Sequence, residues 1–140
     1  NNKGEFILCW DNARFVNHSF NSNCISTAYE FEIAVRDILP GEQLTDDYGY
    51  LNVTEPFDCV PEKGSSRTRV MPDDILTNYT DWDEKLIAAF KKFEKVEQPL
   101  ASLLEKRILQ KAQCIAKGET KMDSILTCYF SGNGTSKRVK

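Results

Sequence analysis

Arg14-Phe15-Val16-Asn17-His18-Ser19-Phe20-Asn21-Ser22-Asn23-Cys24 and Gly41-Glu42-Gln43-Leu44-Thr45-Asp46-Asp47-Tyr48-Gly49 are the two stretches that decide the fold of this chain. Ala34-Val35-Arg36-Asp37-Ile38 lies between them. The first stretch is rich in Asn and Ser, whose side chains hydrogen-bond to nearby backbone groups, so residues 15–24 are predicted to be irregular. The second follows a Pro-Gly turn at residues 39–42 and continues into a short strand at residues 43–45.

Further strands are predicted on either side of the first stretch. Phe6-Ile7-Leu8-Cys9-Trp10 is a continuous apolar run that indicates a buried strand, and Asp11-Asn12 after it is a turn signal. From Tyr29 to Val35 apolar and polar residues alternate, which predicts a half-buried strand. Residues 55–69 contain two prolines, a glycine and paired serines, and are predicted to form a loop.

The period of the apolar residues becomes helical after residue 72. The first helical segment is marked by Trp82, Leu86, Phe90 and Phe93. Asp81, followed three residues later by Glu84, predicts its start, and Pro99 ends it. A second stripe stops near Gly118 and consists of Leu100, Leu103, Leu104, Ile108 and Ile115. A shorter helix is predicted over residues 122–130.

Composition and charge exclude several classes of protein. The chain has 140 residues, a net charge of −3 and an ordinary share of hydrophobic residues, which is typical of a globular domain. The acidic balance disfavours direct nucleic-acid binding. No apolar run is long enough to cross a bilayer, and no signal peptide is visible. The five cysteines are odd in number and form no C-x-x-C pair, so we expect an intracellular protein of the cytoplasm or nucleus.

Taken together, the three quoted stretches resemble the SET domain of protein-lysine methyltransferases. The hallmark motifs of that family are R-F-x-N-H-S-C-x-P-N-C and G-E-E-L-x-x-D-Y-G, and the intervening A-x-R-D-I also matches. The resemblance covers about residues 5–60 and is greatest to compact, bacterial-like SET proteins. It implies an α+β fold, with the C-terminal part of a SET domain and its pseudoknot at residues 1–55. A degenerate post-SET-like loop (56–71), a helical extension (72–130) and a flexible tail (131–140) are expected to follow.

The resemblance also implies a cofactor and a site. The cofactor is S-adenosylmethionine, and its expected contacts are Arg14, Phe15, Asn17, His18 and Phe57. Tyr48 corresponds to the active-site tyrosine of the family and, with Tyr50, is expected to line the substrate channel. The expected partner is a protein that bears a lysine, such as a basic, histone-like segment.

The implied chemistry is consistent with these side chains. A lysine amine must be neutral to attack the methyl group, and its ordinary pKa is about 10.4. Burial in an apolar channel beside a sulfonium cation lowers that pKa. A tyrosine hydroxyl such as that of Tyr48 can align the amine and accept a C–H···O contact from the polarised methyl.

A zinc site is not expected. Post-SET segments bind zinc through cysteines, but Phe20 stands at the position of the knot cysteine, Pro61 replaces a second, and residues 64–67 replace a third. Cys59 alone remains, whereas such a site needs four thiolates. Asp46 and Asp47 have no second ligand cluster beside them, so we expect Asp47 to support the knot rather than a metal.

Two alternatives stay open. Taken without the family, His18 and Tyr48 are an ordinary turn histidine and an ordinary turn aromatic. Within the family, the chain could be a catalytically inactive or truncated SET module that acts as a protein-interaction domain. The G-x-G loop that wraps the methionine end of the cofactor has no counterpart in residues 1–16, so we expect a fragment that binds cofactor weakly by itself.

Overall fold

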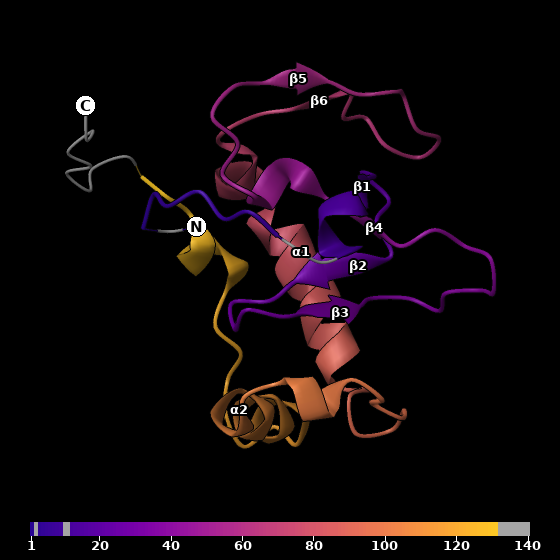
Figure 1. Ribbon diagram of the computed structural model, residues 1–140, viewed down its shortest axis with the longest axis vertical. Helices are drawn as coiled ribbons and strands as arrows, with labels where there is room; N and C mark the ends of the chain where they lie inside the picture. The colour runs from indigo at the N-terminus through magenta and orange to yellow at the C-terminus, as the bar shows by residue number, and fades with distance from the viewer. Residues whose placement is uncertain (2, 10–11, 132–140) are drawn as a thin grey trace.

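The structure is a computed structural model that describes residues 1, 3–9 and 12–131. In these residues, short strands and 3-10 turns occupy the first half and helices occupy the second (Figure 1). The long helix α1 (Asp74–Phe90) runs through the middle of the molecule, with α2 (Lys106–Ala116) across one of its ends. The predicted α+β class is therefore confirmed.

Three two-stranded sheets form within the described residues. Strand β1 (Asn17–His18) pairs in parallel with β4 (Thr45–Asp46), and β2 (Cys24–Ser26) pairs antiparallel with β3 (Glu32–Ala34). Strand β5 (Phe57–Asp58) pairs antiparallel with β6 (Arg69–Val70). The last pair lies inside the segment predicted to be a loop, because two-residue strands carry too little pattern to be recognised in a sequence.

The hairpin of β2 and β3 confirms the alternation predicted for this region and shortens the strand. Phe31, Ile33 and Val35 are half-buried, whereas Glu32 and Ala34 are exposed. Tyr29 and Glu30 lie in the connecting turn instead of the strand, since Glu30 adopts a left-handed φ of 64° there. The Pro-Gly turn is also confirmed: Glu42 N donates to Leu39 O at 2.9 Å, and Gly41 has a φ of 83°.

Helix α1 begins at Asp74, so the predicted start at Asp81 is wrong. The buried face continues N-terminally through Ile75, one heptad before Trp82. Asp81 lies in mid-helix, where its carboxylate forms an exposed ion pair with Lys85 at 2.7 Å. A carboxylate three residues before another acidic residue is equally common on a solvated helix face, which is why this signal misled.

The C-terminal segment is less helical than its apolar stripe predicts. Helix α2 begins at Lys106 and ends before Gly118, whose φ of 75° confirms the predicted stop. Leu100 and Leu103 lie outside α2 and are exposed. Leu103 belongs to the 3-10 turn η3 (Ala101–Leu103), and Leu100 directly precedes this turn. The short helix predicted over residues 122–130 is the 3-10 turn η4 (Ile125–Cys128).

Residues 5–9 form neither a strand nor part of the core, which contradicts the predicted buried strand. Phe6 is 91% exposed, and Ile7 and Leu8 are also largely exposed. Among the described residues no strand pairs with this segment, and an unpaired strand cannot satisfy its backbone groups. Trp10 and Asp11 of the predicted strand and turn, and nearly all of the predicted flexible tail (132–140), lie outside the described residues.

One apolar core joins the strands to the helices. Ile25 of β2 packs in a single cluster with Ile75, Trp82 and Leu86 of α1 and with Ile125 of η4. A second cluster around Phe90, Phe93 and Ala112 joins α1 to α2. Helix α1 therefore packs directly against the β2–β3 hairpin. None of the helices in the described part of the chain is sufficiently long and apolar to traverse a lipid bilayer.

Candidate functional site

The two sequence stretches that decide the fold meet at the β1–β4 pairing. Asn17 lies opposite Thr45 and His18 opposite Asp46, and Ser19 N donates to Asp46 O at 2.9 Å. This parallel pairing brings segments about 28 residues apart into direct contact. The pseudoknot itself, in which one segment passes through the loop of the other, stays a prediction.

Asn23 fastens the same two segments a second time. Its side chain is 1% exposed, donates from Nδ2 to Gln43 O at 2.8 Å, and accepts at Oδ1 from Thr45 N at 2.9 Å. A buried amide that satisfies both a carbonyl and an N–H of a neighbouring segment acts as an extra rung of backbone pairing. The relative position of the two segments is thus specified at both ends of the contact.

His18 and Tyr48 are directly hydrogen-bonded. His18 Nδ1 accepts from Tyr48 N at 3.1 Å, and the hydroxyl of Tyr48 donates to Val16 O at 2.5 Å. The hydroxyl oxygen of Tyr48 therefore uses its proton on the backbone and keeps its lone pairs for an incoming donor. Burial, with a smaller contribution from Asp46, raises the pKa of Tyr48, so this hydroxyl stays protonated at neutral pH.

Four rings gather around this hydrogen bond, and we call His18, Phe20, Tyr48 and Phe57 the aromatic cluster. The ring centroid of His18 lies 4.4 Å from that of Phe20, 5.4 Å from that of Tyr48 and 6.5 Å from that of Phe57. Phe57 also faces Tyr48, at 6.4 Å. Phe57 comes from β5, so the 56–71 segment closes one side of the cluster.

The imidazole of His18 carries an unused hydrogen-bond donor. Because Nδ1 accepts from Tyr48 N, the proton of the neutral ring belongs on Nε2. That atom is buried and has no hydrogen-bond partner among the described residues. Burial lowers the pKa of His18, and the opposing negative charges of Asp47 and Glu62 do not restore it, so the ring is neutral at physiological pH.

Glu62 attaches the 56–71 segment to the loop after β1. Its carboxylate accepts hydrogen bonds from Ser19 Oγ at 2.8 Å, Phe20 N at 3.2 Å and Asn21 N at 3.1 Å. Burial alone would raise the pKa of this carboxyl, but the hydrogen bonds from these groups together lower it. Glu62 therefore fixes the loop that carries Phe20.

Arg67 makes the second attachment. It pairs with the buried Asp47 and with Asp74 at the start of α1, and it lies 4.4 Å above the ring of Phe20. Sequence reasoning missed Glu62, Arg67 and the packing role of Phe20. A single charged residue in a Gly- and Ser-containing loop gives no periodic signal that would have distinguished it from a solvated side chain.

The remaining predicted site residues are not members of the aromatic cluster. Arg14 and Phe15 are exposed in the 3-10 turn η1 (Asn12–Phe15), where the guanidinium lies 4.6 Å from the phenyl centroid. Asn17 is exposed at its side chain and paired through its backbone. Tyr50 is 3% exposed, packs on Trp82 and accepts a hydrogen bond from Ser26 N at 3.0 Å. The structure thus places the ring of Tyr50 in the core, and its role in a substrate channel stays a prediction.

No group of three or more His, Cys, Asp or Glu side chains capable of holding a metal occurs among the described residues. Cys59 is a free, half-buried thiol.

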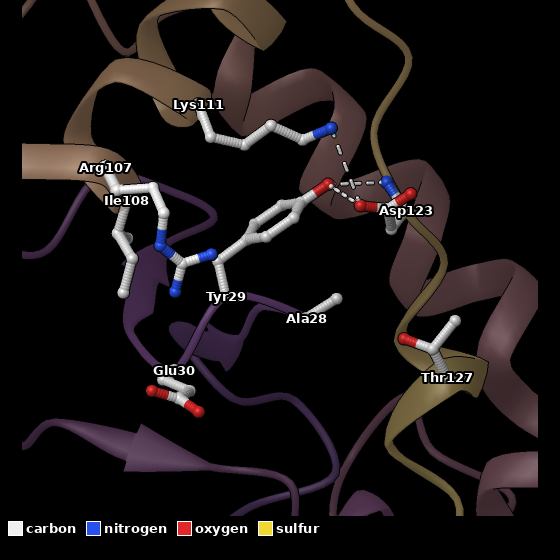
Figure 2. Close-up of a pocket in the computed structure, with 8 residues that line it drawn as sticks. All are labelled: Ala28, Tyr29, Glu30, Arg107, Ile108, Lys111, Asp123 and Thr127. Carbon is white, nitrogen blue, oxygen red and sulfur yellow. Dashed lines mark hydrogen bonds and ion pairs between the residues drawn. The ribbon is translucent and has the colours of Figure 1, made fainter.

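A cavity of about 610 Å³ lies elsewhere, between the turn of residues 28–30 and α2 (Figure 2). Tyr29 points across it, and its hydroxyl donates to Asp123 Oδ2 at 2.9 Å and accepts from Asp123 N at 2.6 Å. Lys111 approaches the same carboxylate at 3.7 Å. These side chains satisfy one another, and the cavity shares no residue with the aromatic cluster, so we place the candidate site at the cluster.

Comparison with known proteins gives one match. The family model described as SET domain matches residues 2–49, which include β1, β4 and Tyr48. No curated protein and no solved structure matches the chain.

Proposed function

We propose, from the premise that residues 2–49 of this chain belong to the SET-domain family, that the protein transfers methyl groups from S-adenosylmethionine to lysine side chains of proteins. The observation that carries the proposal is the contact between the two family motifs. Strands β1 and β4 pair in parallel, and the hydrogen bond from Tyr48 N to His18 Nδ1 joins the motif residues at one point.

The aromatic cluster has the chemistry to hold such a cofactor. The unpartnered Nε2 of His18 is a buried donor, and a buried donor without a partner costs free energy until a ligand acceptor meets it. The ring of Phe57, 37% exposed at the edge of the cluster, offers a face on which an adenine can stack. When bound, S-adenosylmethionine supplies the electrophilic methyl group. Asn17, Arg14 and Phe15 stay predicted contacts.

Tyr48 has the properties that the reaction requires of the chain. Its hydroxyl oxygen is oriented by donation to Val16 O and retains lone pairs that can accept from a lysine amine or a polarised methyl. Its raised pKa keeps it neutral, so Tyr48 aligns the amine and does not remove its proton. The net charge of −3 is ordinary for a globular domain and is compatible with a basic substrate segment.

The test is transfer of labelled methyl from S-adenosylmethionine to lysine-rich proteins, with Tyr48→Phe as the variant. Loss of the oriented hydroxyl is expected to lower the transfer rate at least tenfold while cofactor binding changes little. Tyr79→Phe, a tyrosine of α1 outside the cluster, is the matched control and should retain the rate. Transfer that survives Tyr48→Phe unchanged would overturn the role of Tyr48, and protein binding without any transfer would replace the proposal by the non-catalytic interaction module.

A further inference from the structure

The guanidinium of Arg67 connects three parts of the molecule. Nη1 lies 2.5 Å from Asp47 Oδ2, and Nη2 donates to Asp47 Oδ1 at 3.2 Å and to Asp74 Oδ2 at 2.6 Å. Asp47 directly precedes Tyr48, and Asp74 is the first residue of α1. One side chain from the 56–71 segment therefore joins the turn that carries Tyr48 to the central helix.

The surroundings leave this guanidinium little freedom. Asp47 is 1% exposed and Asp74 is also buried. The guanidinium lies 4.4 Å from the ring centroid of Phe20 and 5.6 Å from that of Trp82. A Cβ on Gly49 would come within 2.5 Å of Nη2, so the backbone of the turn approaches the guanidinium as closely as a glycine permits.

We propose that Arg67 is a positioning residue for the candidate site: by bridging Asp47 to Asp74 it holds the Asp47–Gly49 turn against α1, and thereby sets the position of Tyr48 and its hydrogen bond to His18. Asp47 Oδ1 also accepts from Gly49 N at 3.0 Å. The carboxylate that binds Arg67 is therefore also the one that stabilises the turn. Tyr48 lies between Asp47 and Gly49 in this turn, and its backbone N donates to His18 Nδ1.

The geometry requires arginine and not just a positive charge. A planar guanidinium can bind two carboxylates through separate nitrogens at once, whereas an ammonium is a point charge on a flexible stem. Lysine at position 67 is therefore expected to restore the charge between Asp47 and Asp74 without restoring the fixed turn.

The single histidine of the chain makes this distinction measurable. The charged groups that act on His18 are Asp47 and Glu62, which raise its pKa, and Arg67, which lowers it. The backbone of Asp46 raises it as well. The ¹⁵N signals of the imidazole report both its pKa and which nitrogen carries the proton, and the exchange rate of the Tyr48 amide reports the hydrogen bond between the two residues.

The experiment compares Arg67→Met, Arg67→Lys and Arg69→Met in the full chain. In the unaltered protein we expect the proton of the neutral ring on Nε2 and a protected Tyr48 amide. Arg67→Met should raise the pKa of His18, mix the two tautomers and speed exchange of the Tyr48 amide at least tenfold. Arg67→Lys should return the pKa toward its original value while the tautomers stay mixed.

Arg69→Met is the matched control, since Arg69 follows Arg67 by two residues, at the start of β6, and forms an exposed ion pair with Asp58 at 2.7 Å. It should change neither readout. An Arg67→Lys variant with a single Nε2–H tautomer and a protected Tyr48 amide would show that charge alone suffices and overturn the proposal. If Arg67→Met does not fold, Asp74→Ala removes the acceptor on α1 and keeps the pairing of Arg67 with Asp47. An Asp74→Ala variant in which Tyr48 amide exchange is unchanged would also overturn the proposal.

A kinetic measurement extends the inference and rests on the proposed function. In the methyl-transfer assay Arg67→Lys should lower kcat at least tenfold with little change in the KM for S-adenosylmethionine. Absence of transfer in every variant, the unaltered chain included, would count against the proposed function, whereas the spectroscopic result on His18 and Tyr48 would still decide the role of Arg67.

Discussion

Asp46 shows at the scale of one residue how burial and charge compete next to the candidate site. Its side chain is 3% exposed, and burial, reinforced by the negative charge of Glu32, raises its pKa from 3.8 to about 8. The hydrogen bond from Asp47 N opposes this shift without reversing it. The neutral acid is thus the stable form of Asp46 in the folded protein at pH 7.

A consequence for stability follows from the direction of that shift. Because the folded pKa lies above the unfolded one, the contribution of Asp46 is fully present below pH 3.8 and is lost as the pH rises through about 8. Asp46→Asn keeps the shape and the acceptor for Asp47 N and cannot ionise. We expect it to raise the Tm at pH 8 by roughly 3 °C or more, and to leave the Tm at pH 4 nearly unchanged.

The control for this prediction is Asp58→Asn, which neutralises an exposed carboxylate on β5. Its Tm should depend on pH as that of the unaltered chain does. Thermal unfolding followed by circular dichroism across this pH range provides the comparison. If the Tm of Asp46→Asn fell between pH 4 and pH 8 by as much as that of the unaltered chain, the assignment would be refuted.

Single residues also show what the sequence could and could not predict. The motifs indicated His18 and Tyr48 as partners, and the structure joins them by a hydrogen bond. The resemblance implied a channel position for Tyr50, and in the structure its ring, at the end of the 3-10 turn η2 (Tyr48–Tyr50), lies in the core. Neighbouring positions in a turn diverge in direction, and spacing along the sequence cannot resolve that.

At the scale of elements, the paired strands β5 and β6 and the turn between them form a cover over the loop after β1. Glu62 is the anchor of this cover, through its hydrogen bonds to Ser19, Phe20 and Asn21. Glu62→Ala should free Phe20 N and speed hydrogen exchange of the Phe20 amide on the order of tenfold, corresponding to a lost interaction of about 1.4 kcal/mol. The Asn21 amide should speed up less, because it also donates to Ser19 Oγ at 3.0 Å.

Glu55→Ala is the matched control, because Glu55 is exposed in the same part of the chain. Exchange of the two amides should stay slow in that variant. Equal rates in both variants would mean that Glu62 does not hold the loop. The lowered pKa of Glu62 adds a pH test: its contribution is present above the ordinary glutamate pKa and is lost as the pH falls through the folded value.

Elements with a long apolar period were predicted better than short ones. The buried face of α1 was recognised from Trp82, Leu86 and Phe90, although its first two turns were missed because they contain one fully buried apolar residue, Ile75. The strands of two or three residues depend on partners far along the chain. Strand β1, for instance, exists because β4 lies beside it, and its dipeptide has no strand signal of its own. The strand predicted at residues 43–45 overlaps β4 at Thr45 alone.

At the scale of the whole molecule, the segment that matches the SET family and the helical extension share one core. Leu86 of α1 is fully buried in the cluster that contains Ile25 of β2. Leu86→Ala should destabilise the protein by about 2–5 kcal/mol, and the loss of helix and the loss of the His18–Tyr48 contact should occur in one transition.

Leu76→Ala is the control within the same helix, since Leu76 is 44% exposed and its truncation should cost far less. The two transitions are followed by circular dichroism for the helix and by the imidazole signals of His18 for the site. If α1 of the Leu86→Ala variant melted while the His18 signals stayed native, the strands and helices would be independent units and the shared core would carry no coupling.

The aromatic cluster around His18 and Tyr48 is the proposed binding place of S-adenosylmethionine. Titration of the ¹⁵N-labelled chain with S-adenosylmethionine to millimolar concentration tests it most directly, because the sole histidine reports from inside the cluster. We predict saturable, concerted shifts of the His18 Nε2, Tyr48 and Phe57 signals, with little change at Tyr29 and Asp123 beside the cavity between residues 28–30 and α2. Signals of the aromatic cluster that stay fixed, or shifts centred on Tyr29 and Asp123, would contradict the claim.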